Sequence, residues 1–116
     1  MKCYRDLVVW QHGVDLVVDV YKLSKNFPSV ERYALCYQMQ RAAVSIPANI
    51  AEGYERNHRK EYLQFLHIAK GSLGELDAYL LLAKDLGYLA DEEFKRAYSK
   101  RQDTVKMLHG LIKELS

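Results

Sequence analysis

Glutamate and histidine at helical spacing are the first residues to test for chemistry, because helical bundles hold dinuclear metal sites through two inward-facing Glu-x-x-His motifs. The sequence contains one such motif, at residues 55–58, directly after Gly53. The other histidines, His12, His67 and His109, complete no second copy. A single motif in a turn supplies too few ligands for such a site. We therefore expect no metal and no cofactor.

Nucleophilic catalysis needs an activated hydroxyl or thiol with a neighbouring base. Cys36 and Ser45 both lie in helical sequence, without a strained elbow, an adjacent base or a glycine-rich oxyanion loop. A phosphate-binding Gly-Lys-Ser/Thr loop is also missing. We expect no catalytic residues and no enzyme activity, although a site assembled from distant side chains remains an alternative.

Positive charge gathers at two places, although the net charge of +2 is too small to indicate polyanion binding by itself. One place is the turn before the expected third helix, and the other is the last helix. Both are candidate contacts for RNA or DNA, and the alternative is that they are ordinary solvated surface. The candidate residues are Arg56, Arg59, Lys60, Lys95, Arg96 and Lys100.

A polar column runs along the expected second helix at steps of three and four residues. Two interpretations remain open: a solvated helix face, or a hydrogen-bonded network buried against another helix or subunit. In the second case, Asn49 and Ser45 bridge backbone groups freed by Pro47, and Arg41 and Glu52 supply opposite charges. The column consists of Gln38, Arg41, Ser45, Asn49 and Glu52, and with Pro47 and Gly53 it forms the predicted structural site.

The first two helices are predicted at residues 6–26 and 35–52. Asp6 is the expected N-cap of the first helix. Gly53 is the expected left-handed cap of the second, and Pro47 is expected to kink that helix without ending it, because the apolar pattern continues in phase beyond the proline. The expected apolar stripe of the first helix is Trp10, Val14, Val17, Val18 and Tyr21.

The third and fourth helices have the clearest periodicity. A seam of alternating three-residue and four-residue steps predicts a helix over residues 58–86, about 40 Å long and ended by Gly87. Leu66, Leu73 and Leu80 form a second apolar column beside this seam. Asp91 is the expected N-cap of the last helix, in whose seam Arg101 is the one misfit.

These elements predict an all-α protein, an antiparallel up-down four-helix bundle, as one domain over residues 1–116. The chain is 49% hydrophobic, with two cysteines, two prolines and no linker-like stretch. Its longest apolar run is far too short to cross a bilayer. We therefore expect a cytoplasmic protein without membrane contact.

Three segments resemble one protein family: residues 6–11 (DLVVWQ), 41–53 (RAAVSIPANIAEG) and 71–76 (GSLGEL). On these motifs the chain is similar to the 23S ribosomal RNA intervening-sequence proteins. The likeness extends over nearly the whole chain, including residues 86–89 and 107–113. The proline-centred segment is its most specific part.

The resemblance implies a four-helix bundle that assembles as a ring-shaped homopentamer and has no established enzymatic activity. It also implies a suspected role in binding RNA or DNA. A group with a similar fold, the accessory variability determinants of diversity-generating retroelements, works with a reverse transcriptase and its RNA. Docking to such a partner, or a purely structural protein–protein assembly, is therefore the alternative function.

Overall fold

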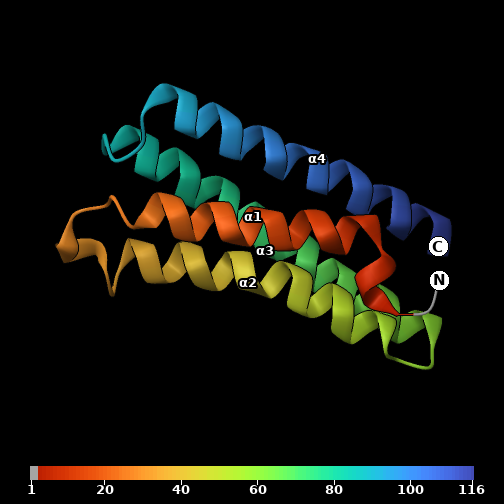
Figure 1. Ribbon diagram of the computed structural model, residues 1–116. Helices are drawn as coiled ribbons and strands as arrows, with labels where there is room; N and C mark the ends of the chain where they lie inside the picture. Colours follow the sequence, from red (N-terminus) through yellow and green to blue (C-terminus); the bar gives the residue numbers. More distant parts are fainter. Residues whose placement is uncertain (1–2) are drawn as a thin grey trace.

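The computed structural model describes residues 3–116, and every regular element among them is helical. Consecutive α-helices run in opposite directions (Figure 1), which confirms the predicted all-α four-helix fold. Two short 3-10 turns, labelled η, precede the first and second α-helices. The elements are η1 Tyr4–Asp6, α1 Val8–Ser24, η2 Ser29–Glu31, α2 Leu35–Tyr54, α3 Arg59–Asp85 and α4 Asp91–Leu115.

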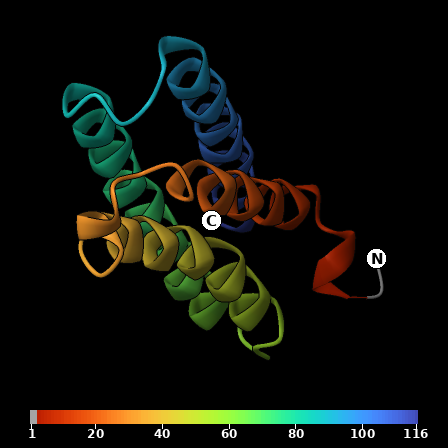
Figure 2. The same cartoon turned by 60° about the vertical axis from the view of Figure 1, so that its left-hand side comes forward.

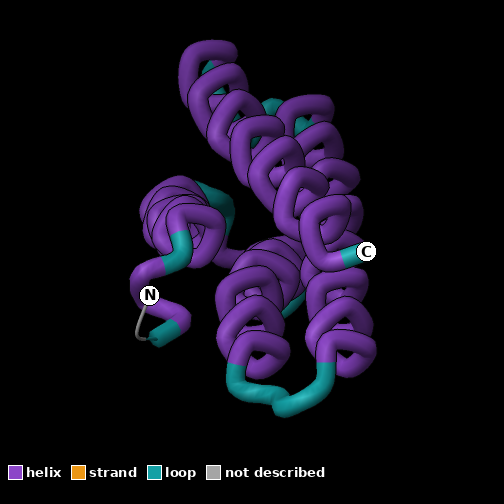
Figure 3. The backbone as a smooth tube through the Cα atoms, turned by 90° about the vertical axis from the view of Figure 1, so that its right-hand side faces the viewer, coloured by secondary structure: helices purple, strands orange, loops and turns teal. Residues whose placement is uncertain are grey.

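Each α-helix packs against the next one along the chain, and α1 also packs against α4. The contact between α2 and α3 is the most extensive of these. The α2–α3 turn and the α3–α4 turn lie at opposite ends of the bundle (Figure 2). Figure 3 views the bundle from the end that carries the α2–α3 turn. The bundle is 43 Å long, close to the length of α3 alone.

One cluster of buried apolar side chains draws on all four helices. Both predicted columns of α3 contribute to it: Leu66, Leu73 and Leu80 of the second column are completely buried, and so are Ala69, Leu76 and Ala83 of the first. A helix that contacts both α2 and α4 must bury a broad stripe, which explains why two adjacent apolar columns are needed.

The predicted apolar stripe of α1 is out of phase with the buried face. Val9, Leu16 and Val20 are buried, whereas Val18 and Tyr21 are each 43% exposed. The other three predicted positions are only partly buried. This helix is apolar around most of its circumference, so periodicity alone could not decide which side faces α2 and α4.

Both predicted aspartate N-caps are wrong. Leu7 is the N-cap of α1, and Asp6 instead accepts a hydrogen bond from the Cys3 amide, 3.3 Å away, within the preceding turn. Asp91 is the first residue of α4 rather than its cap. At that helix the Glu93 carboxylate accepts a 2.9 Å hydrogen bond from the Ala90 amide. At η1 and at α4, the carboxylate of the third helical residue thus accepts a hydrogen bond from the N-cap amide, whereas the start of α1 has no side-chain cap.

Pro47 lies inside α2 and does not end it, as predicted. Gly53 is not the predicted left-handed cap, because α2 continues to Tyr54, and Gly87 is the only described residue with positive φ. A Cβ at Gly53 would lie 2.9 Å from Phe65 Cβ and 3.1 Å from the Tyr62 carbonyl oxygen. Gly53 is therefore required for the close approach of α2 and α3.

Candidate functional site

The centre of the predicted polar column forms a hydrogen-bonded network between α2 and α3. The Asn49 side-chain amide donates to the Ser45 carbonyl at 2.7 Å and to the Ser45 hydroxyl at 2.9 Å. The Ser72 hydroxyl of α3 donates to the same Ser45 hydroxyl at 2.8 Å. Ser45 and Asn49 are half-buried and Ser72 is buried. The buried interpretation therefore holds for the middle of the column.

The ends of the column follow the other interpretation, because Gln38, Arg41 and Glu52 are exposed. Glu52 does not pair with Arg41 but forms an ion pair with Arg56, at 3.2 Å. The prediction that Asn49 and Ser45 bridge the backbone groups freed by Pro47 is also corrected. The carbonyl deprived of a donor by this proline is four residues earlier, at position 43, whereas the Asn49 amide reaches the Ser45 carbonyl.

The turn between α2 and α3 is less basic than its sequence indicates. Arg56 pairs with Glu52 and lies 3.6 Å from the Glu61 carboxylate, with its guanidinium 4.8 Å from the centre of the Phe65 ring. These contacts hold Arg56 against its own bundle and neutralise its charge. Of the three predicted residues in this turn, only Arg59 and Lys60 remain exposed without an ion-pair partner among residues 3–116.

The predicted basic patch on α4 is also reduced. The Lys100 ammonium lies 2.7 Å from the Asp19 carboxylate and 3.0 Å from that of Asp15, both on α1. The hydrogen bond to Asp19 is the main cause that raises the pKa of Lys100; burial opposes it, and the hydrogen bond to Asp15 adds a smaller increase. Lys100 therefore fixes α4 to α1, and Lys95 and Arg96 are the exposed cations that remain.

The structure keeps the two remaining basic pairs apart. Arg59 and Lys60 begin α3, at the end of the bundle with the α2–α3 turn, whereas Lys95 and Arg96 lie in the first turns of α4, near the opposite end (Figure 1). They cannot form one continuous basic surface on a single copy of the chain.

Arg101, the misfit in the seam of α4, makes a contact that sequence reasoning missed. Its Nε donates a 2.7 Å hydrogen bond to the Leu73 carbonyl oxygen of α3, and its side chain is only 12% exposed. One guanidinium nitrogen lies 3.7 Å from a carboxylate oxygen of Asp77. The apolar seam position was the available signal, since a charged residue there must find polar partners.

A groove of about 340 Å³ follows the outer side of the α2–α3 pair. Ser45 and Ser72 contribute its hydroxyl groups, and Arg41 and Glu75 contribute opposite charges. Neither charged side chain has an ion-pair or hydrogen-bond partner within residues 3–116. The groove is lined by Gln38, Arg41, Ala42, Ser45, Ile68, Ser72 and Glu75.

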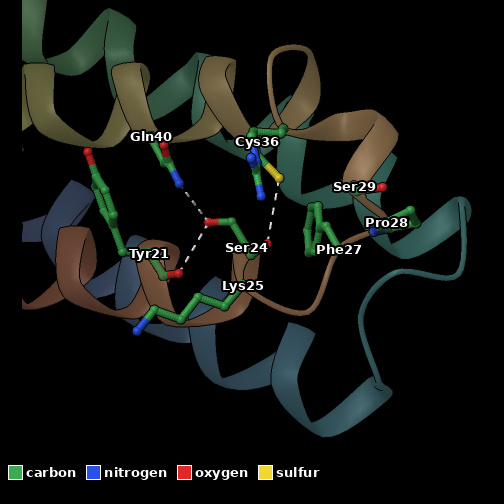
Figure 4. A pocket seen from close by; sticks show the side chains of 9 residues that line it. Tyr21, Ser24, Lys25, Phe27, Pro28, Ser29, Cys36 and Gln40 are labelled. Atoms are coloured by element: carbon green, nitrogen blue, oxygen red, sulfur yellow. Dashed lines mark hydrogen bonds between the residues drawn. The ribbon is translucent and has the colours of Figure 1, made fainter.

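A second cavity, of about 470 Å³, lies where α1 ends and α2 begins (Figure 4). Ser24 donates a hydrogen bond to the Val20 carbonyl and accepts one of 3.3 Å from the Gln40 amide. The Cys36 thiol points toward the Ser24 carbonyl oxygen, 3.6 Å away. Burial, with help from the charge of Glu31, raises the pKa of this thiol, so it stays protonated at neutral pH.

The histidines and acidic residues do not come together as metal ligands in the described part of the chain: no three His, Cys, Asp or Glu side chains there are grouped to hold an ion. Glu55 and His58 both lie exposed in the α2–α3 turn. No described helix is long and apolar enough to span a membrane.

The comparisons with known proteins agree with this geometry. A crystal structure from Bacteroides thetaiotaomicron, of a protein with unknown function from the S23 ribosomal protein family, has a TM-score of 0.85 and 24% sequence identity. The alignment covers 91% of this chain and 99% of that one, and it supports the fold. No curated protein matches the sequence. The family described as 23S rRNA-intervening sequence protein matches residues 5–110, and this chain therefore belongs to that family.

Proposed function

We propose that this protein is a non-catalytic, cytoplasmic module that assembles with copies of itself, as a homopentamer, and binds RNA or DNA. The observation that carries the proposal is that large apolar side chains remain exposed although the bundle already has a complete core. They are Val8, Val18, Tyr21, Val30, Tyr33, Tyr37, Val44, Ile68, Leu81, Leu82 and Leu86.

Nucleic-acid binding is assigned to the four predicted cations that form no ion pair with a carboxylate of the described chain. Arg59 and Lys60 at one end, and Lys95 and Arg96 near the other, are free to contact phosphates. Each pair supplies little charge on one copy. Assembly would repeat the pairs around a symmetric particle and would provide the multiple phosphate contacts that such binding requires.

The test measures binding to a structured RNA and to duplex DNA over a salt series. Neutralising the pair that contacts the nucleic acid should weaken binding. The two variants to compare are Arg59→Gln with Lys60→Gln and Lys95→Gln with Arg96→Gln. It should also reduce the slope of log affinity against log salt by about 0.7 to 0.9 for each lost phosphate contact. The control, Lys22→Gln with Lys113→Gln, removes the same charge elsewhere. Binding without a salt slope, or equal loss in the control, contradicts the assignment.

A purely structural or protein-docking assembly is the second candidate. It is favoured by the partly neutralised charge of the α2–α3 turn, where Arg56 contacts Glu52 and Glu61. This candidate predicts no affinity for nucleic acid at physiological salt. It also predicts retention of a partner protein, such as a reverse transcriptase, from the native host. Salt-dependent binding of purified protein to RNA or DNA would contradict it.

A further inference from the structure

The outer side of α2 and α3 carries features that the bundle itself does not use. The α2–α3 face is defined here as Arg41 and Val44 on α2 with Ile68, Gly71 and Glu75 on α3. All five are exposed, and Arg41, Ile68 and Glu75 line the same groove. Helical spacing places Val44 beside Arg41 and places Gly71 between Ile68 and Glu75.

The two charges on this face have no partner. Arg41 and Glu75 line one groove, yet they form no ion pair with each other or with any other residue of the described chain. Other charged side chains of the bundle, such as Arg56 and Lys100, do find acidic partners. The face therefore offers one free positive and one free negative group to another molecule.

The same face exposes apolar surface and unhindered backbone. Ile68 is 51% exposed and Val44 is 42% exposed. Gly71 lies in the interior of α3, where glycine costs about 1 kcal/mol relative to alanine. A Cβ at this position would meet nothing within 4 Å, so packing inside the chain does not require glycine there. The absence of a side chain at Gly71 would let a second molecule approach the α3 backbone closely.

Charge complementarity indicates which kind of molecule binds the α2–α3 face. A nucleic acid would bring phosphates against Glu75, where like charges repel. Arg41 lies on the α2 side of this face and Glu75 on the α3 side, so in a closed ring the arginine of each copy can meet the glutamate of the next, while Ile68 and Val44 lose exposed surface. This inference rests on the proposed assembly and specifies its surface.

We propose that copies of this chain assemble through the α2–α3 face, with Arg41 of one copy paired to Glu75 of its neighbour. The test uses light scattering of the full chain over a concentration series. Each charge reversal, Arg41→Glu or Glu75→Arg, should raise the concentration for half-assembly by at least tenfold. The double variant restores opposite charges and should return to within about threefold of the wild-type value.

Lys22→Glu, on the exposed side of α1, is the matched control and should assemble like wild type. Circular dichroism should be unchanged in every variant, because the reversed side chains are exposed. Wild-type assembly in both single reversals overturns this surface and leaves the proposed assembly intact. A double variant as weak as the singles overturns the Arg41–Glu75 pairing. A monomeric wild type would overturn the proposed function itself.

Discussion

The Lys100 ammonium on α4 lies 2.7 Å from the Asp19 carboxylate on α1, which links the last helix to the first. Asp15 adds a second contact to the same ammonium at 3.0 Å. The Asp19 side chain is only 13% exposed, so it is more protected from water than a typical surface ion pair. The α1–α4 contact thus depends partly on one cation, which would otherwise be available for nucleic acid.

Replacing Lys100 should loosen this contact. Lys100→Met keeps most of the apolar stem but leaves Asp19 without its cation, and we expect a loss of about 1 kcal/mol in the free energy of unfolding. Urea denaturation at neutral pH measures the change. Lys95→Met, at an exposed position on the same helix, is the control and should have almost no effect. Equal stability of Lys100→Met and wild type would show that the link contributes nothing.

The same ion pairs predict a pH dependence. The pKa of Lys100 is raised above its usual 10.5, so its contribution is complete below that pH and is lost as pH rises through the higher folded value. The hydrogen bond from Lys100 lowers the pKa of Asp15 below 3.8, so that contribution is lost only as pH falls below this value. The stability difference between wild type and Lys100→Met should therefore be constant from about pH 5 to pH 9. A difference that changes within this range would contradict the assignment.

Arg101 should contribute more to stability than its charge suggests. Arg101→Met removes the hydrogen bond to the Leu73 carbonyl and leaves the Asp77 carboxylate without its nearby cation, and we expect a loss of about 2 kcal/mol in urea denaturation. Adding Asp77→Asn removes the unpaired charge and should recover part of that loss. If the double variant is less stable than Arg101→Met, the proposed coupling is wrong.

Substitution by alanine should have opposite effects on stability at Gly53 and at Gly110. Gly53→Ala forces a Cβ against Phe65 and the Tyr62 carbonyl, so it should destabilise the protein by about 1 to 3 kcal/mol despite the better helix propensity of alanine. At Gly110 a Cβ meets nothing within 4 Å, and Gly110→Ala should stabilise α4 by up to about 1 kcal/mol. Thermal unfolding of both variants tests this difference. A gain at position 53 would contradict the close approach of α2 and α3.

Gly87 should resist substitution for a different reason. Its φ is +80°, and its amide and that of Tyr88 each donate a 2.9 Å hydrogen bond to a carbonyl in the last turn of α3. Gly87→Ala should cost about 1 kcal/mol in urea denaturation, because a Cβ disfavours left-handed backbone. Gly87→Asn should cost less, since asparagine tolerates this conformation better. Equal losses would argue against backbone strain as the cause.

The parts of the fold that the sequence predicts well depend on residues that are close together in the chain. The end of α3 follows from Gly87, and its buried columns follow from a strict helical period. Gly53 shows the limit of such predictions, because a glycine near a helix end fits both a left-handed cap and a close helix crossing. Only the position of Tyr62 and Phe65 on α3 distinguishes the two.

The candidate site was harder to predict because parts of it depend on contacts between different helices. Local sequence marks Arg56 and Lys100 as available cations. The Glu52 partner of Arg56 is only four residues earlier, so the sequence already contained that signal. Lys100 is met by Asp19, which is far away in the chain and is brought near only by the fold.

The spacing of the polar column predicted that Ser45 and Asn49 share one side of α2, and these two side chains are hydrogen-bonded to each other. The division of the column into a half-buried centre and exposed ends depends on Ser72, which belongs to another helix.

Self-assembly is the central claim, and the molar mass of the full chain in solution tests it most directly. Light scattering at micromolar protein concentration and physiological salt should give one species with a mass close to five times that of the 13.5 kDa chain. A mass of 13.5 kDa that persists as the protein concentration is raised would contradict the account.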